Sequence, residues 1–223
     1  MVDKNTWETL RRSFKARGVT LVAVSKTKPA GDIMALYEAG QRDFGENYVQ
    51  ELVEKQALLP ADIRWHYIGH LQSNKVKLIA PFVYLIHAVD SYRLLEEINK
   101  YGAKNNRVID ILLQVHIADE ETKFGMDDKE IRALIDSYRF NEDALSHVRI
   151  CGLMGMATNT EDTGKVRSEF VHLSDLFKTL AITSFAGRPY FSVCSMGMSA
   201  DYNIAIDAGS NMVRIGSLLF GSR

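Results

Sequence analysis

The stretch Leu21-Val22-Ala23-Val24-Ser25-Lys26-Thr27-Lys28-Pro29 is an apolar run followed at once by a lysine and a proline. Its β-branched and aliphatic residues favour a strand over residues 20 to 25. Pro29 suits the first turn of a helix, where a missing N–H is tolerated. We therefore expect a strand, a corner that carries Lys26, and then a helix. An amine held at such a corner can lose solvation and attack a carbonyl carbon.

The same order of short strand and longer helix recurs from residue 20 onward, which is typical of a parallel sheet built from βα units. The expected strands are Leu21 to Ser25, Arg42 to Gly45, Arg64 to Ile68, Tyr84 to His87, Ile109 to Gln114, Arg149 to Met154, Tyr190 to Val193, and Met212 to Ile215. The expected helices cover residues 30 to 39, 47 to 57, 72 to 80, 91 to 102, 127 to 137, 161 to 181 and 199 to 208. A further amphipathic helix is expected at 3 to 17, and a flexible loop between Ile117 and Met126.

These units predict an α/β fold, a single (β/α)8 TIM barrel over residues 1 to 223, with an additional N-terminal helix and no second β domain. Such barrels place their chemistry on the loops after the strands, and Lys26 falls on that rim. A doubly wound open sheet is the alternative. The turn after the first strand has no Gly-x-Gly-x-x-Gly pattern, so nucleotide binding of that type is not indicated.

Composition narrows the class of partner. The 223 residues are 46% hydrophobic and 25% charged, with a net charge of −1, so no basic field would attract nucleic acid or an acidic membrane surface. Cys151 and Cys194 each lie in an apolar stretch without C-x-x-C spacing, and we expect buried free thiols. The polar N-terminal residues do not resemble a signal peptide. We expect a cytoplasmic protein, monomeric or weakly dimeric, that binds a small molecule.

Two loops near the end of the chain have the composition of a phosphate site. After the seventh expected strand comes Cys194-Ser195-Met196-Gly197-Met198-Ser199-Ala200-Asp201, with Ser199 a natural helix N-cap. After the eighth comes Arg214-Ile215-Gly216-Ser217. Small residues, serine hydroxyls and free backbone N–H groups together bind phosphate, and barrels often do so after strands seven and eight. Because strand eight closes against strand one, Lys26 should share this rim.

This geometry predicts a ligand with a phosphate at one end and a carbonyl at the other, which fits both pyridoxal 5'-phosphate and a sugar phosphate. Arg214 lies between apolar residues in a strand, where a guanidinium needs a partner. That partner is either the nitrogen of a pyridine ring or an acid such as Asp207, and the sequence leaves both open.

Other polar residues near the rim have competing interpretations. Asn47 can bind a ring hydroxyl or cap the helix that follows it. His66 and His70 are four residues apart without a third ligand, so no metal is expected; His70 is the nearer to the rim. His87 ends the fourth expected strand and can either reach the ligand or, as we expect, be a buried histidine with satisfied hydrogen bonds. The methionines that either contact the ligand or fill the core are Met154, Met156, Met196 and Met198.

Several motifs, in order along nearly the whole chain, resemble those of the pyridoxal phosphate homeostasis proteins of the YggS/PROSC type. They are Ala23 to Pro29, Phe44 to Glu51, Trp65 to Lys75, Lys123-Phe124-Gly125, Gly152-Leu153-Met154, Ser195 to Asp201, and Val213 to Gly216. The resemblance implies a barrel similar to the N-terminal domain of alanine racemase. It also implies pyridoxal phosphate held as a Schiff base on Lys26, with Ser199 and Gly216-Ser217 at the phosphate and Arg214 at the pyridine nitrogen.

The cofactor-binding residues that we expect are Lys26, Asn47, Ser199, Arg214, Gly216 and Ser217, with His70, Ser195 and Met196 as further candidates. Members of the family are regarded as carriers or regulators of cofactor and amino-acid pools without an established catalytic turnover, and apo pyridoxal phosphate enzymes are the expected partners. A pyridoxal phosphate-dependent amino-acid racemase or lyase is the alternative function. A Schiff-base aldolase acting on sugar phosphates is a second one.

Overall fold

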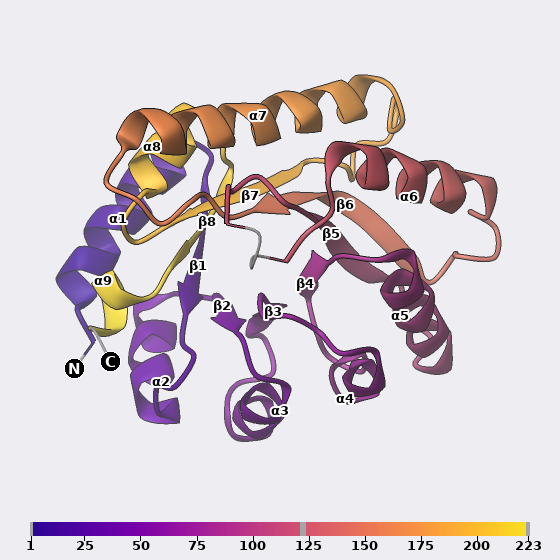
Figure 1. Ribbon diagram of the computed structural model, residues 1–223. Coiled ribbons are helices and arrows are strands. Elements are labelled where there is room, and N and C mark those ends of the chain that lie inside the picture. The colour runs from indigo at the N-terminus through magenta and orange to yellow at the C-terminus, as the bar shows by residue number, and fades with distance from the viewer. Residues whose placement is uncertain (1, 121–123, 222–223) are drawn as a thin grey trace.

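Parallel strands close into a barrel in the order β1-β2-β3-β4-β5-β6-β7-β8, which confirms the predicted fold. The computed structural model describes residues 2–120 and 124–221. The strands are β1 (Thr20–Val24), β2 (Asp43–Glu46), β3 (Arg64–Tyr67), β4 (Leu85–Val89), β5 (Ile109–Val115), β6 (Val148–Gly155), β7 (Val193–Met198) and β8 (Met212–Ile215). Figure 1 shows the helices arranged around these strands.

The helices follow the strands in the alternating order that the sequence predicts. They are α1 (Lys4–Ala16), α2 (Ala30–Ala39), α3 (Val49–Leu58), α4 (Val76–Ile79), α5 (Tyr92–Lys104), α6 (Asp128–Phe140), α7 (Thr163–Ile182), α8 (Tyr202–Asp207) and α9 (Ser217–Phe220). Helices α1 and α9 lie side by side in Figure 1. The N–H of Asp3, just before α1, donates to the carbonyl of Leu219 in α9 at 2.8 Å. In the described part of the chain, no helix combines the length and the apolar character needed to cross a membrane.

The seventh strand was placed wrongly by the sequence pattern. Tyr190 and Phe191 favour a strand by composition, but Phe191 stacks on Phe185 with ring centroids 4.0 Å apart, and β7 begins only at Val193. Its residues Cys194 to Met198 carry no strong strand signal and are held by the neighbouring strands β6 and β8. Ser195 and Met196 therefore lie within the strand and not in the loop after it.

Two helices also differ from expectation. The helix expected at 199 to 208 begins at Tyr202, and that expected at 72 to 80 is a 3-10 turn, Ser73–Lys75, followed by α4. Of the loop expected to be flexible, residues 121–123 lie outside the described residues. Cys151 and Cys194 are buried free thiols, as expected, and burial raises the pKa of each to about 12.

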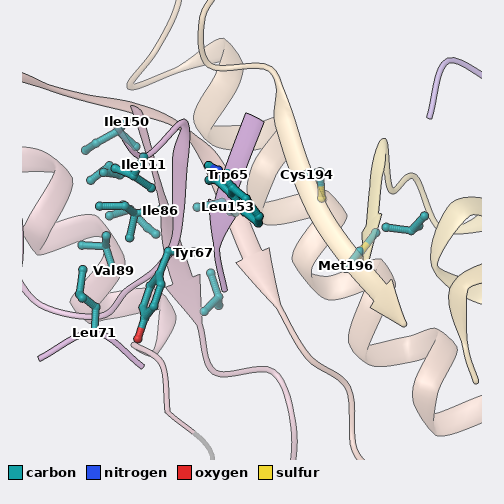
Figure 2. Packing of buried hydrophobic residues seen from close by; sticks show 14 of the residues in the cluster. Trp65, Tyr67, Leu71, Ile86, Val89, Ile111, Ile150, Leu153, Cys194 and Met196 are labelled. Carbon is teal, nitrogen blue, oxygen red and sulfur yellow. The ribbon is translucent and has the colours of Figure 1, made fainter. Parts of the chain in front are cut away.

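Side chains alternate between the two faces of the barrel wall, because successive strand residues point to opposite sides. The outer face packs against the helices, and Figure 2 shows Ile86, Ile111 and Ile150 close together there, from β4, β5 and β6. The inner face carries a smaller apolar cluster that includes Val22 of β1 and Met212 of β8. The two faces have different partners, so the position of a residue along its strand decides whether it reaches the barrel interior.

Candidate functional site

A cavity of about 460 Å³ opens at the C-terminal ends of the strands. Lys26, Asn47, Ser199, Arg214, Gly216 and Ser217 all line it. Its other described lining residues are Val24, Thr27, Lys28, Ile68, Met156, Met198, Ala200 and Gly221. The sequence therefore predicted the groups that meet here, although they come from both ends of the chain.

Strand pairing and alternation explain why these residues meet. In the β1–β8 pair, Val22 lies opposite Arg214 and Ala23 opposite Ile215. Val22 and Met212 belong to the inner cluster, so residues an even number of positions further along the same strands turn toward the interior. Val24 follows Val22 by this rule and Arg214 follows Met212, and both line the cavity. Lys26 lies in the turn just after β1 and lines it as well. Barrel closure thus brings the first and last strands to one cavity.

The corner that carries Lys26 is held from outside the barrel by a buried ionic network. Thr27 has a left-handed backbone, with φ 63°, and its N–H donates to Glu51 at 2.6 Å. The buried Lys55 donates to Glu51 and Glu46, each at 2.7 Å, and to the carbonyl of Ser25 at 2.8 Å. The network fixes the residues on both sides of Lys26, since a left-handed non-glycine backbone persists only where its surroundings impose it.

Glu46 and Lys55 are the two buried ionisable side chains of this network. Burial raises the pKa of Glu46, and its hydrogen bonds to Lys55 and Ser25 oppose the shift. Lys55 was missed by the sequence analysis, because it looks like one more exposed helix lysine. The only local signal is its position four residues after Glu51, a spacing that favours an ion pair on a helix.

The loops after β7 and β8 contact each other at the expected phosphate end. The N–H of Gly216 donates to the hydroxyl of Ser199 at 3.3 Å. The expected N-cap role of Ser199 is wrong: α8 begins at Tyr202 without a side-chain cap, and Asp201 accepts from the N–H of Met198 at 2.6 Å. The Ser199 hydroxyl therefore faces the loop after β8 and the cavity.

Arg214 is 4% exposed and its guanidinium is held by β6 and β7. Its Nη1 donates to the carbonyl of Ser195 at 2.9 Å and to the Ser195 hydroxyl at 2.6 Å, and its Nη2 donates to the carbonyl of Gly155 at 3.0 Å. The salt bridge to Asp207 that the sequence left open is not formed, because Asp207 pairs with Arg17 at 2.7 Å. These bonds use three of the five N–H groups of the arginine, and the other two have no hydrogen-bond partner within the described residues.

Arg214 keeps its positive charge at neutral pH. Burial lowers its pKa to about 10, although the negative charge of Asp201 opposes that shift. A pKa near 10 still leaves the guanidinium protonated at pH 7. Arg214 is therefore a permanent hydrogen-bond donor in the cavity wall.

Asn47 has a rigid backbone and an unused side-chain acceptor. The Tyr67 hydroxyl donates to its carbonyl at 3.0 Å, and Gly69 packs so closely that an added Cβ would lie 2.2 Å from the same oxygen. The buried Asn47 Oδ1 has no hydrogen-bond partner among the described residues. The N-cap alternative is wrong, because Tyr48 precedes α3 and no side chain caps that helix. An orphaned buried acceptor in a cavity wall indicates a missing donor, such as a ligand hydroxyl.

The three further candidates lie outside the cavity lining. His70 lines a neighbouring groove, where it pairs with Asp90 at 3.3 Å and stacks on Phe124 with ring centroids 4.4 Å apart. Ser195 is fully buried and touches Arg214. Met196 is buried in the outer cluster, and Figure 2 shows it on β7 with Cys194.

The remaining candidates divide by strand position. Met156 and Met198 line the cavity, whereas Met154 belongs to the inner apolar cluster. His66 and His87 are buried in the barrel interior. Within residues 2–120 and 124–221, no three His, Cys, Asp or Glu side chains are placed to hold a metal ion.

Comparison with known proteins places the chain in a family. It matches the model of the alanine racemase N-terminal domain over residues 4–223. The pyridoxal phosphate homeostasis protein of Aquifex aeolicus (strain VF5) is 40% identical over 204 residues, which are 91% of this chain and 86% of that protein. The chain belongs to the pyridoxal phosphate homeostasis protein family. The protein of the same name from Escherichia coli (strain K12) is 38% identical over 229 residues, covering 99% of this chain and 93% of its own.

Solved structures agree with this assignment. PipY of Synechococcus elongatus PCC7942, solved with pyridoxal phosphate bound, is 34% identical with a TM-score of 0.85, covering 97% of this chain and 99% of its own. The alanine racemase of Bartonella henselae is 20% identical with a TM-score of 0.70, over 97% of this chain and 59% of the racemase. That second likeness concerns the fold alone.

Gly69→Ala tests the close contact that fixes Asn47. The added Cβ would meet backbone atoms of Asn47, which must then move, so we expect unfolding to become easier by about 1–3 kcal/mol. The matched control is Gly31→Ala in α2, where a Cβ meets nothing within 4 Å and helix propensity favours alanine by about 0.5–1 kcal/mol. Urea unfolding measures both. Equal stabilities for the two variants would contradict the contact.

The lowered pKa of Asp43 predicts how the free energy of unfolding depends on pH. Burial would raise its pKa, but hydrogen bonds from Arg64 and His66 overcome this and lower the pKa to about 2. Since the folded-state pKa lies below the ordinary value of 3.8, the contribution of Asp43 is full above pH 4 and is lost as the pH falls toward 2. This pKa shift corresponds to a contribution of about 2 kcal/mol to the free energy of unfolding.

Asp43→Asn should therefore destabilise the protein at pH 7 by roughly that amount, about 2 kcal/mol, and the difference from the wild type should shrink toward pH 2. The control is Asp136→Asn, a change at an exposed carboxylate on α6 that should have little effect at any pH. Chemical denaturation across the pH range gives both curves. A difference that stays constant from pH 7 to pH 2 would rule out the ionised pair as its source.

Proposed function

We propose that this chain holds pyridoxal 5'-phosphate in the cavity through a Schiff base on Lys26, and that it acts in pyridoxal phosphate homeostasis as a carrier or regulator of the cofactor. One observation carries the proposal: Lys26, Asn47, Ser199, Arg214 and the Gly216-Ser217 turn line one cavity. The membership of the chain in the pyridoxal phosphate homeostasis family supports it. The bound cofactor in PipY is consistent with it.

The residues present fit the parts of the cofactor one by one. Ser199 and Ser217 offer hydroxyl donors for a phosphate group, and the small Gly216 lets that group approach the backbone closely. Arg214 has N–H groups left for the acceptor nitrogen of the pyridine ring. The unpartnered Asn47 Oδ1 is an acceptor for the ring hydroxyl. The ionisable residues among the described lining are Lys26, Lys28 and Arg214, which suits a phosphorylated ligand.

The same residues favour carriage over catalysis. When bound, the cofactor supplies an aldehyde and a ring that can withdraw electrons from an attached amino acid. Arg214, protonated at neutral pH, would donate to the ring nitrogen and keep it from gaining a proton, which would limit that withdrawal. Racemisation also needs an acid or base on each side of the substrate. Lys28, the other lining amine, instead donates to the carbonyls of Phe220 at 3.0 Å and Gly221 at 3.3 Å.

The proposal extends to partners and location. Apo enzymes that require pyridoxal phosphate are the acceptors that a carrier would serve. We place the protein in the cytoplasm and expect a monomer or a weak dimer. Analytical ultracentrifugation at several protein concentrations measures the oligomeric state.

Lys26→Ala tests the assignment of the amine. The wild type, mixed with pyridoxal phosphate, should give the visible absorption of a Schiff base, and borohydride should fix the cofactor on the peptide that contains Lys26. Lys26→Ala should lose this absorption, whereas Lys77→Ala, at an exposed position of α4, should keep it. Mass mapping locates the adduct. A pyridoxyl group on another lysine of the wild type would refute the assignment.

The same samples separate the carrier from a racemase or lyase. We expect transfer of cofactor to an apo enzyme and no steady turnover of amino acids. Turnover that disappears in Lys26→Ala would favour the enzymatic alternative.

A further inference from the structure

A continuous chain of polar side chains crosses the barrel interior beneath the cavity. Asp43 Oδ1 lies 3.0 Å from Nε2 of His66, and Nδ1 of His66 lies 2.9 Å from Nε2 of His87. Nδ1 of His87 lies 3.2 Å from the hydroxyl of Ser195, which accepts from Arg214 Nη1 at 2.6 Å. Asp43, His66, His87, Ser195 and Arg214 are all buried, and we call these residues the relay.

The two ends of the relay impose one direction on every hydrogen bond. An arginine can only donate and an ionised carboxylate can only accept. The Ser195 oxygen already accepts from Arg214, so its hydrogen is available to Nδ1 of His87. A neutral His87 that accepts at Nδ1 carries its proton on Nε2 and donates to His66. His66 must then carry its proton on Nε2 as well, and it donates to Asp43.

Charges at the two ends favour this arrangement. Asp43 accepts from Arg64 Nε at 2.7 Å, and the Arg64 guanidinium also contacts Asp43 Oδ2 at 2.5 Å, so the carboxylate stays ionised. Burial, with the nearby His66 and Arg214, holds the pKa of His87 well below its ordinary value. The aligned dipoles run from a buried cation to a buried anion, and hydrogen bonds in such a chain strengthen one another.

The relay also joins the two ends of the barrel. Asp43 and Arg64 line a second cavity, of about 750 Å³, at the N-terminal ends of the strands. Arg214 lines the cofactor cavity at the opposite ends. The buried guanidinium of Arg214 is thus connected to a carboxylate near the far mouth, although the oxygens to which it donates directly are neutral.

We propose that Asp43, His66, His87 and Ser195 are positioning residues for Arg214: they form a one-directional hydrogen-bond relay that fixes its guanidinium at the ligand cavity. This inference deepens the proposed function and rests on it where Arg214 is taken to face the pyridine nitrogen. None of the four positioning residues lines the cofactor cavity, so each acts through Arg214.

The tautomers of the two histidines give a test that needs no cofactor. In long-range ¹H–¹⁵N spectra of the ligand-free protein at pH 7, His66 and His87 should each show a protonated Nε2 and a bare Nδ1. Ser195→Ala removes the donor to His87, so its single tautomer should give way to a mixture. A protonated Nδ1 on either histidine of the wild type would overturn the relay.

Binding of pyridoxal phosphate tests whether the relay acts on Arg214. Ser195→Ala should weaken binding about tenfold, the usual effect of one hydrogen bond to a charged group. Ser174→Ala is the matched control, because Ser174 is an equally buried serine whose hydroxyl has no partner in the described structure. Equal affinities for the two variants would overturn the positioning role.

A conservative replacement separates the relay from simple packing. His87→Gln offers one acceptor and one donor and should bind within about threefold of the wild type, whereas His87→Leu should lose about tenfold. Equal losses in both would contradict the relay. If His87→Leu does not fold, the tautomers and Ser195→Ala still decide the question. Failure of the wild type to form an adduct at Lys26, with the tautomers as stated, would count against the proposed function and not against the relay.

Discussion

Closure of the last strand against the first is the constraint on which the rest of this structure depends. The pairing of Val22 with Arg214 fixes how far each strand has advanced when it reaches the rim. Because side chains alternate along both strands, that one register turns Val24 and Arg214 toward the same interior space and brings the turn that carries Lys26 beside them. A shift by one residue would turn Val24 or Arg214 toward the helices outside. Strand pairing therefore brings the two chain ends to one site, and the ionic network around Lys55 holds the corner of Lys26 there.

Buried charge is then arranged on both sides of the barrel wall. Outside, Lys55 joins Glu46 and Glu51 beneath the corner that carries Lys26. Inside, Asp43 and Arg214 lie at opposite ends of a line of neutral hydrogen-bonding groups. Buried ions are costly unless they are paired, so neither arrangement is an efficient way to gain stability. Each instead restricts the position of a residue that lines the cavity: the corner of Lys26 in one case and the guanidinium of Arg214 in the other.

The sequence predicted the parts of this structure that depend on local patterns. The alternation of strands and helices was sufficient for the barrel, and small residues near Ser199 and Gly216 were sufficient for the two loops. The errors concern competition between local and distant partners. Ser199 and Asn47 are good N-caps by type, but neighbouring loops and Tyr67 determine where they lie. Strand β7 was misplaced, because its residues are held by flanking strands and not by their own propensity.

Other features could not be found from the sequence at all. The buried ionic network at the Lys26 corner and the relay both join residues far apart in the chain. No spacing rule relates Asp43 to Arg214. The salt bridge considered for Arg214 had a plausible acid in Asp207, yet that acid pairs with Arg17, the residue that follows α1. Predictions of this kind require the register of the barrel and the positions of its helices, which only the folded structure provides.

The central claim is that barrel closure builds one cofactor site from both ends of the chain, and a crystal structure of the protein grown with pyridoxal phosphate tests it most directly. We expect continuous density from Lys26 Nζ to the cofactor, a phosphate between Ser199 and the Gly216-Ser217 turn, and a ring nitrogen facing Arg214. Cofactor bound elsewhere, or in this cavity with its phosphate away from those two loops, would contradict the account.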